Sequence, residues 1–208
     1  MFLKTCLRLF KALLFVERCI VCQKEGDILH RHCVGMFRGA PRHAIPWIHS
    51  QWCYRDPAIR RLIYHIKKQP SRDLLSHCLD GIALPFDSEN IVIVPVPASP
   101  QRMSTYGFNQ AHSIAETLIH IHPDMQLYDA LFHNQSFTPK QALLKNRTQR
   151  LVSRSGIFSI KNGYAKSLHN THIVIIDDVS TTGATLIEAR RVLEQAGPVS
   201  IEAWTLCH

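Results

Sequence analysis

The sequence predicts an α/β fold, in which a mainly parallel, twisted sheet is flanked by helices. Two runs of apolar, β-branched residues, at 91–94 and 173–176, have the composition of strands buried on both faces. Each run is followed by a polar loop and then by apolar residues at helical spacing. Strands that alternate with helices in this way are typical of a parallel sheet.

Residues 1–18 form the first predicted element, an amphipathic helix with a basic face. Lys4, Arg8 and Lys11 recur at helical spacing and interrupt every apolar stretch that a signal peptide would need. We expect this helix to pack on its own domain or on a partner. A peripheral contact with a membrane surface stays open as the alternative.

A cluster of metal-ligand residues follows the helix. Cys19 and Cys22 form a CxxC pair, and His30 and Cys33 form an HxxC pair a short way downstream. Together they would supply four ligands to one structural Zn²⁺, with His32 as the alternative third ligand. Such a site stabilises a segment too short to build its own core. We therefore predict a helix and zinc-knuckle segment at 1–50 and one main domain at 51–208.

The main domain is predicted to begin with a strand and two helices. The strand is expected at 52–54. Asp56 and Pro57 mark the start of the first helix, and Ser71 caps the second after Pro70 has ended the first. Further along, we predict a loop at 98–107, a helix from Phe108, a strand at 156–160, a loop at 161–170 and a closing strand at 199–206.

Composition limits the class of protein but does not identify the ligand. The 208 residues carry a net charge of +8, which suits a polyanionic small ligand, nucleic acid or an anionic surface equally. No stretch of 18 apolar residues is present to span a membrane. Seven cysteines, three of them at metal-ligand spacing, indicate reduced thiols and therefore a cytoplasmic protein.

The stretch 172–187 is the strongest functional signal in the chain. A buried strand leads into Asp177 and Asp178 and then into small and hydroxylated residues that open a helix. Backbone N–H groups at a helix N-terminus favour an anion, and Gly183 would let the backbone approach a phosphate. Carboxylates would repel that phosphate but suit sugar hydroxyls or a divalent cation. One ligand satisfies both halves, a sugar that carries a 5′-phosphate and free hydroxyls.

Val174–Thr185 resembles the phosphoribosyl-pyrophosphate (PRPP) motif of type I phosphoribosyltransferases. The resemblance implies a fold of that type and a site for PRPP with Mg²⁺. Asp177 and Asp178 would be the catalytic acids, together with Arg102 in a loop that grips the pyrophosphate. The residues implied in ligand binding are Val179, Ser180, Thr181, Thr182, Gly183, Ala184, Thr185, Ser99 and Arg147.

A second resemblance covers nearly the whole chain. Val94–Pro97, Arg102 and Gly107–Gln110 are similar to the signature of the ComF competence-protein family, phosphoribosyltransferase-like proteins of naturally transformable bacteria. Cysteine knuckles before this signature and the PRPP motif after it keep the family's order. Tyr106 stands where the family usually has Arg, and His30 where it usually has Cys. The downstream segment is kept in part, as Gln141, Leu144, Arg147 and Arg150.

The two resemblances imply PRPP binding, possible transfer of ribose 5-phosphate, and a role in DNA uptake. In such transferases a mobile basic loop closes over the substrate, which makes Gln141, Lys145, Arg147 and Arg150 candidates here. Two alternatives stay open, a non-catalytic PRPP sensor and a nucleic-acid-binding adaptor. The adaptor would meet single-stranded DNA or the DNA-uptake helicase and other competence proteins. The acceptor substrate and the oligomeric state are left open by the sequence.

Overall fold

The fold is built on a five-stranded parallel sheet, seen in a computed structural model that describes residues 18–82, 89–134 and 156–208. The strand order is β1-β7-β6-β2-β3, and every pairing is parallel. These strands are β1 (Ile48–Trp52), β2 (Ile91–Pro95), β3 (Gln126–Leu127), β6 (His172–Val179) and β7 (Ser200–Cys207). A separate antiparallel pair joins β4 (Leu131–His133) to β5 (Phe158–Ile160). The predicted fold class is confirmed.

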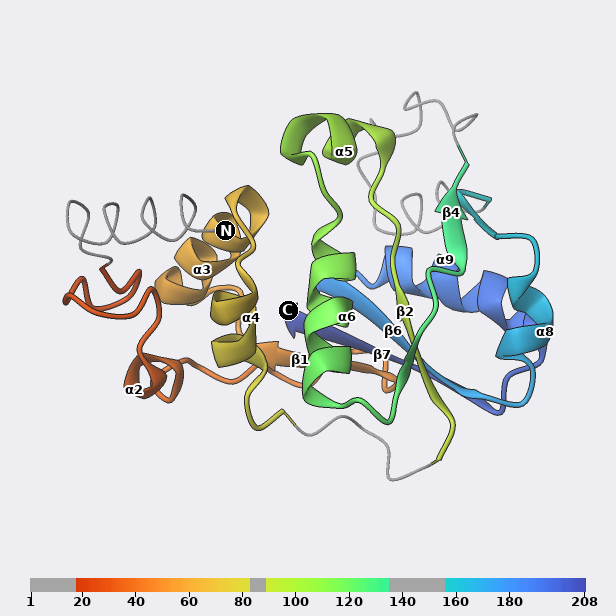
Figure 1. Cartoon of the computed structure of the whole chain (residues 1–208), viewed down its shortest axis with the longest axis horizontal. Coiled ribbons are helices and arrows are strands. Elements are labelled where there is room, and N and C mark those ends of the chain that lie inside the picture. The colour runs from red at the N-terminus through yellow and green to blue at the C-terminus, as the bar shows by residue number, and fades with distance from the viewer. Residues whose placement is uncertain (1–17, 83–88, 135–155) are drawn as a thin grey trace, which may run out of the picture.

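Helices cover both faces of the sheet, as Figure 1 shows, with α6 in front of the strands and α9 behind them. They are α2 (Arg31–Val34), α3 (Pro57–Lys68), α4 (Arg72–Leu79), α5 (Pro100–Tyr106), α6 (Gln110–Ile121), α8 (Tyr164–Leu168) and α9 (Ala184–Leu193), with a 3₁₀ turn at Glu194–Ala196. One core joins α3, α4 and α6 to Val174 and Ile176 of β6. The other joins α8 and α9 to Ile173 and Ile175, since successive strand residues face opposite sides.

The predicted helix caps are confirmed at both helices that follow β1. Asp56 Oδ1 accepts a hydrogen bond of 2.8 Å from the Ala58 N–H, with Pro57 at the first helical position. Ser71 Oγ accepts one of 3.1 Å from the Leu74 N–H at the start of α4. Each cap satisfies an N–H that the helix itself leaves without a partner, which contributes about 1 kcal/mol.

Local structure differs from the prediction in four places, apart from shifts of one or two residues at the ends of the strands predicted at 156–160 and 199–206. The first strand, β1, ends at Trp52 rather than spanning 52–54, and it begins at Ile48, inside the segment predicted to precede the main domain. The expected loop at 98–107 contains helix α5, which Ser99 caps. The following helix begins at Gln110 with Asn109 as its cap, not at Phe108. The expected loop at 161–170 contains α8.

The structure tests whether any described helix could cross a membrane. Within residues 18–82, 89–134 and 156–208, no helix combines the length and the apolar character needed to cross a bilayer. The predicted amphipathic helix at 1–18 lies almost wholly outside the described residues, so its predicted contacts stay a prediction.

Candidate functional site

The two acids of the PRPP-like motif lie inside strand β6 rather than beyond its end. The strand continues to Val179, whose backbone pairs with Cys207 of β7. Asp177 and Asp178 are therefore held by the sheet, and both are buried. The Asp178 N–H donates to Asp177 Oδ1 over 2.9 Å, which fixes the first carboxyl against the backbone of the second.

Two cations from distant parts of the chain face the Asp178 carboxylate. Lys67 Nζ, from the end of α3, lies 3.0 Å from Asp178 Oδ2, and Arg102 Nη1, from α5, lies 3.8 Å from Asp178 Oδ1. The Lys67 contact is ionic and lacks the alignment of a hydrogen bond. Because the Asp178 side chain is 2% exposed, removing both cations would leave an unpaired buried anion, at a cost of about 3–5 kcal/mol.

The Asp177 carboxyl has a different electrostatic environment. Burial raises the pKa of Asp177 well above its usual range, and the neighbouring Asp178 charge raises it further, while Arg102 opposes the rise. Asp177 therefore takes its protonated form more readily than an exposed carboxyl, and in that form it donates a hydrogen bond. The two acids are adjacent in sequence but not equivalent in charge.

Ser180, the first residue after β6, is pinned by three contacts. Its N–H donates to the Cys207 carbonyl over 3.0 Å, and its own carbonyl accepts from His208 Nδ1 over 3.0 Å. Its hydroxyl lies 3.2 Å from Nε2 of His43, a buried residue of the segment before β1. The His43 and His208 rings pack with centroids 4.3 Å apart. The start of the loop is thus held by residues at the end of β7 and by His43 from the segment before β1.

Gly183 is required by backbone conformation and by packing. Its φ of +75° lies in the left-handed region, which side chains rarely adopt. A Cβ atom at this position would lie 2.8 Å from Ile45 Cδ1 and 2.9 Å from Ile48 Cδ1. The loop therefore turns tightly over the apolar segment that leads into β1, and this close packing requires glycine even without a ligand.

The remaining loop residues stand at the N-terminus of α9, where the macrodipole favours an anion. Thr181 is exposed, Thr182 and Thr185 are half-buried, and Ala184 opens the helix. The Thr182 hydroxyl oxygen accepts from the Ala184 N–H over 3.4 Å. Thr182 thus lies just before the first turn of α9, and Thr185 lies within it.

Some of the residues predicted to bind the pyrophosphate lie in the described part of the chain, and others lie outside it. Ser99 caps α5 by accepting from the Arg102 N–H over 3.3 Å, so its hydroxyl orients the helix that carries Arg102. Gly107 ends that helix in the left-handed conformation. Arg147 and the other candidates of the basic segment, Gln141, Lys145 and Arg150, lie outside the described residues.

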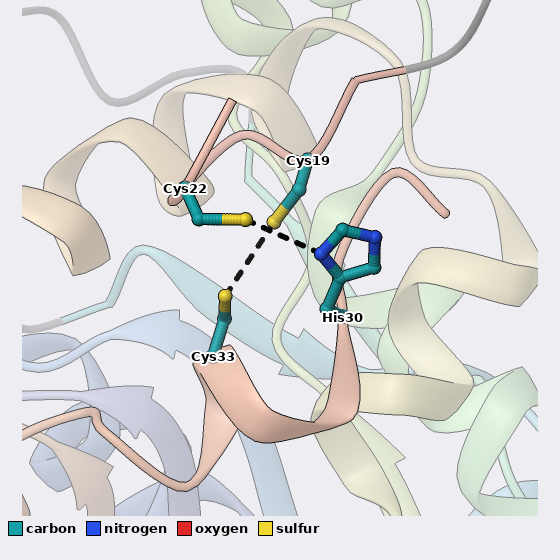
Figure 2. A group of neighbouring side chains, drawn as sticks. All are labelled: Cys19, Cys22, His30 and Cys33. Carbon is teal, nitrogen blue, oxygen red and sulfur yellow. Dashed lines mark hydrogen bonds between the residues drawn. The ribbon is translucent and has the colours of Figure 1, made fainter. Parts of the chain in front are cut away.

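The four predicted metal ligands come together near the N-terminal end of the described chain. Ligand atoms of Cys19, Cys22, His30 and Cys33 all lie within 4.8 Å of one another, and Figure 2 shows the four side chains pointing toward a common centre. Cys19 Sγ lies 3.8 Å from Cys33 Sγ, and Cys22 Sγ lies 3.3 Å from His30 Nδ1. In a tetrahedral zinc site, bonds of about 2.3 Å to sulfur and about 2.0 Å to nitrogen separate neighbouring ligand atoms by about 3.5–3.8 Å. The residues fit zinc.

The thiols of this cluster differ in how readily they ionise. Burial raises the pKa of Cys19, but hydrogen bonds from backbone N–H groups, of which that of Cys22 contributes most, outweigh burial and lower it to about 6. Burial raises the pKa of Cys33 to about 12, with hydrogen bonds to Cys22 and Cys19 adding to the effect. Cys19 thus ionises more readily than Cys33, whose thiol must lose its proton to a binding metal.

Three residues of the site were not among those predicted from the sequence. Lys67 lies off the apolar stripe of α3, a position that favours a solvated helix face over a contact with phosphate and gives no sign of a contact with the acidic pair. His43 stands in a stretch that reads as irregular, and His208 follows the last strand. Their roles depend on contacts across the fold, which sequence spacing does not encode.

The acidic pair does not form a magnesium site made of protein alone. Both Asp178 oxygens lie near protein cations, and burial together with the Asp178 charge raises the pKa of Asp177 well above its usual range. Magnesium commonly binds one or two carboxylates together with substrate phosphates and water. These residues fit Mg²⁺ only when it arrives with a phosphorylated ligand, whose diphosphate it would neutralise.

Comparison with known proteins gives one family match and several relatives. The family model of the phosphoribosyl transferase domain matches residues 141–208. Competence protein ComFC of Bacillus subtilis (strain 168) is 37% identical over 124 residues, which cover 58% of this chain and 46% of that protein. ComFC of Streptococcus pneumoniae is 31% identical over 113 residues, 54% of this chain and 46% of that protein. The chain spans about half the length of these relatives.

Two further similarities are weaker. The DNA utilization protein YhgH of Escherichia coli (strain K12) is 30% identical over 118 residues, 55% of this chain and 48% of that protein. A hypoxanthine phosphoribosyltransferase from Staphylococcus aureus overlaps 70% of this chain and 62% of its own, with 17% identity and a TM-score of 0.35. A likeness at that TM-score carries no functional argument.

Proposed function

We propose that this chain binds PRPP together with Mg²⁺ and serves DNA uptake. As its motifs predicted, it is a relative of the ComF competence proteins with a phosphoribosyltransferase-type domain. The observation that carries the proposal is the loop after β6. Two buried acids at the end of β6 precede it, and it carries a left-handed glycine and threonines at the N-terminus of α9, with Arg102 and Lys67 facing Asp178.

Each part of this arrangement has a partner on PRPP. The first turn of α9 and the hydroxyls of Thr182 and Thr185 would donate to the 5′-phosphate. Asp177 and Asp178 would accept from, or donate to, the ribose hydroxyls. Arg102 would face the diphosphate, which Mg²⁺ neutralises in part. Transfer would break the bond between C1′ and the diphosphate oxygen and form a bond from C1′ to a nitrogen of the acceptor.

Calorimetric titration of PRPP with Mg²⁺ tests the binding, and a panel of nucleobases tests the transfer. We expect PRPP to bind and excess inorganic pyrophosphate to compete with it. Release of pyrophosphate with any base assigns a phosphoribosyltransferase, whereas binding without release assigns a PRPP sensor. Folded protein that binds no PRPP in the presence of Mg²⁺ contradicts the proposal.

A second function, nucleic-acid binding, is favoured by the outer face of α3. Arg60, Arg61 and Lys68 are exposed there around Tyr64, whose side chain is 64% exposed. Lys68 Nζ lies 5.3 Å from the centre of the Tyr64 ring. Cations around an exposed aromatic ring suit the backbone and the bases of a single strand.

Binding of single-stranded DNA at several salt concentrations tests this second function. We expect an affinity that falls as salt rises and that Tyr64→Ala weakens, since base stacking on an aromatic side chain contributes about 1–3 kcal/mol. PRPP should not compete with this DNA, because α3 presents Tyr64 outward and Lys67 toward Asp178. DNA binding that is insensitive both to salt and to Tyr64→Ala would contradict it.

A further inference from the structure

Lys67 lies at the end of α3, where this helix meets the acidic pair of β6. The same helix shares a core with the cysteines of the metal cluster. The apolar side of α3, formed by Ile59, Leu62, Ile63 and Ile66, shares one core with Cys19, Leu29 and Cys33. Because these side chains are buried, packing of this apolar side sets the position of α3. The Lys67 ammonium is therefore held at a defined place, 3.0 Å from Asp178 Oδ2.

The three charged side chains, Asp178, Lys67 and Arg102, differ in how exposed they are to solvent. The Asp178 side chain is 2% exposed, that of Lys67 is 23% exposed and that of Arg102 is 50% exposed. The carboxylate lies innermost, and the two cations lie between it and the solvent. An anion that approached Asp178 from outside would meet these cations before it met the acid.

The chemistry of lysine permits a second contact. An ammonium group has three N–H donors and no acceptor, and it acts as a compact charge that binds phosphate well. The contact with Asp178 engages one side of this group. Arg102 is a second cation facing the same single carboxylate, so the cations at this edge do not pair one to one with Asp178.

We propose that Lys67 is a diphosphate-binding residue of this site, whose ammonium stays anchored on Asp178 and donates to the diphosphate of the ligand. This inference rests on the proposed binding of PRPP and adds a residue from α3 to it. Asp178 then acts as a positioning residue for Lys67 as well as a partner for the sugar. The metal cluster contributes to the position of Lys67 indirectly, because Cys19 and Cys33 belong to the core against which α3 packs.

A purely structural role for Lys67 makes a different prediction. If Lys67 only balances the buried charge of Asp178, then Asp178→Asn removes the need for it, and Lys67 becomes dispensable in that background. If Lys67 binds the diphosphate, it still contributes after Asp178 has lost its charge. The comparison between Asp178→Asn and the double variant Lys67→Met/Asp178→Asn separates the two roles. Neither variant carries an unpaired buried anion at position 178, so both avoid that source of misfolding.

The experiment titrates inorganic pyrophosphate into the full chain, followed by PRPP with Mg²⁺, and uses Lys166→Met on exposed α8 as the control for loss of one charge. We expect Lys166→Met to bind as the wild type does. We expect the double variant to bind pyrophosphate about ten- to a hundredfold more weakly than Asp178→Asn, because one charge-assisted hydrogen bond is lost.

The outcomes that would overturn the inference are distinct from those that would overturn the proposed function. Equal pyrophosphate affinity in Asp178→Asn and the double variant, in a protein whose wild type binds PRPP and pyrophosphate, overturns the role of Lys67 alone. A loss of the same size in Lys166→Met overturns it too, because net charge would then explain the effect. A wild type that binds neither PRPP nor pyrophosphate overturns both.

Discussion

Replacing Gly183 with alanine tests whether the ligand loop is held by packing against the segment before β1. Two costs are expected. Alanine at a φ of +75° costs about 1–2 kcal/mol. Its Cβ would also lie 2.8 Å from Ile45 Cδ1 and 2.9 Å from Ile48 Cδ1, and forcing such contacts costs about 1–3 kcal/mol. The sum is a destabilisation of about 2–5 kcal/mol.

Gly107 provides a matched control for the first of these costs. It has a φ of +79°, but a Cβ there would meet nothing within 4 Å. Gly107→Ala should therefore carry the backbone cost alone. Urea unfolding, followed by circular dichroism, measures both variants, and the difference between their free energies of unfolding gives the packing cost at Gly183.

A mutant cycle identifies the atoms responsible. In an Ile45→Val/Ile48→Val background, which lacks both Cδ1 atoms, the effect of Gly183→Ala should fall toward that of Gly107→Ala, and the 3.3 Å contact with His43 Cε1 accounts for what remains. If Gly183→Ala destabilises the wild type no more than Gly107→Ala does, the loop does not pack as described. If the valine background leaves the effect of Gly183→Ala unchanged, the contacts with Ile45 and Ile48 are not its cause.

Four further predictions concern the metal and the ligand. Purified protein should contain about one zinc per chain by elemental analysis, and Cys19→Ser or Cys33→Ser should lose it. His30→Ala should lower zinc content more than His32→Ala, because His30 Nδ1 belongs to the four-ligand cluster; the reverse order would reassign the third ligand. Zinc affinity, measured by chelator competition, should fall from about pH 8 to about pH 6, since protons compete for the thiolates; an affinity independent of pH would contradict thiolate ligation. Thr182→Ala should weaken binding of PRPP and ribose 5-phosphate alike, by about ten- to a hundredfold in calorimetry, and a selective loss of only one ligand would place Thr182 away from the 5′-phosphate.

Features with strong local signals were predictable from the sequence. The apolar runs in β2 and β6 and the caps at Asp56 and Ser71 are each encoded by a few neighbouring residues, and the structure confirms them. The gathering of Cys19, Cys22, His30 and Cys33 was also predictable, because ligand spacing is a local property. The resemblance to ComF proteins rested on similar short motifs and is confirmed by the relatives.

Features that depend on distant contacts were not predictable in the same way. Strands β3 and β4 are very short, with two and three residues, so no alternation of polar and apolar residues marks them. Helix α5 has no buried residue, so it lacks the apolar stripe by which a helix is recognised. The contact of Lys67 with Asp178 joins residues far apart in sequence, and a lysine at the edge of an apolar stripe usually faces water.

The position of β7 has a consequence for the order of assembly. This strand comes last in the chain, yet it lies between β1 and β6 in the sheet. The side chains of Ser50 and Thr205, which bond across β1 and β7 over 2.8 Å, are 155 positions apart. During synthesis β1 therefore emerges long before its only ladder partner in the described part of the chain. Until β7 has been synthesised, the backbone of β1 stays open to wrong partners, and the β1–β7–β6 part of the sheet cannot close.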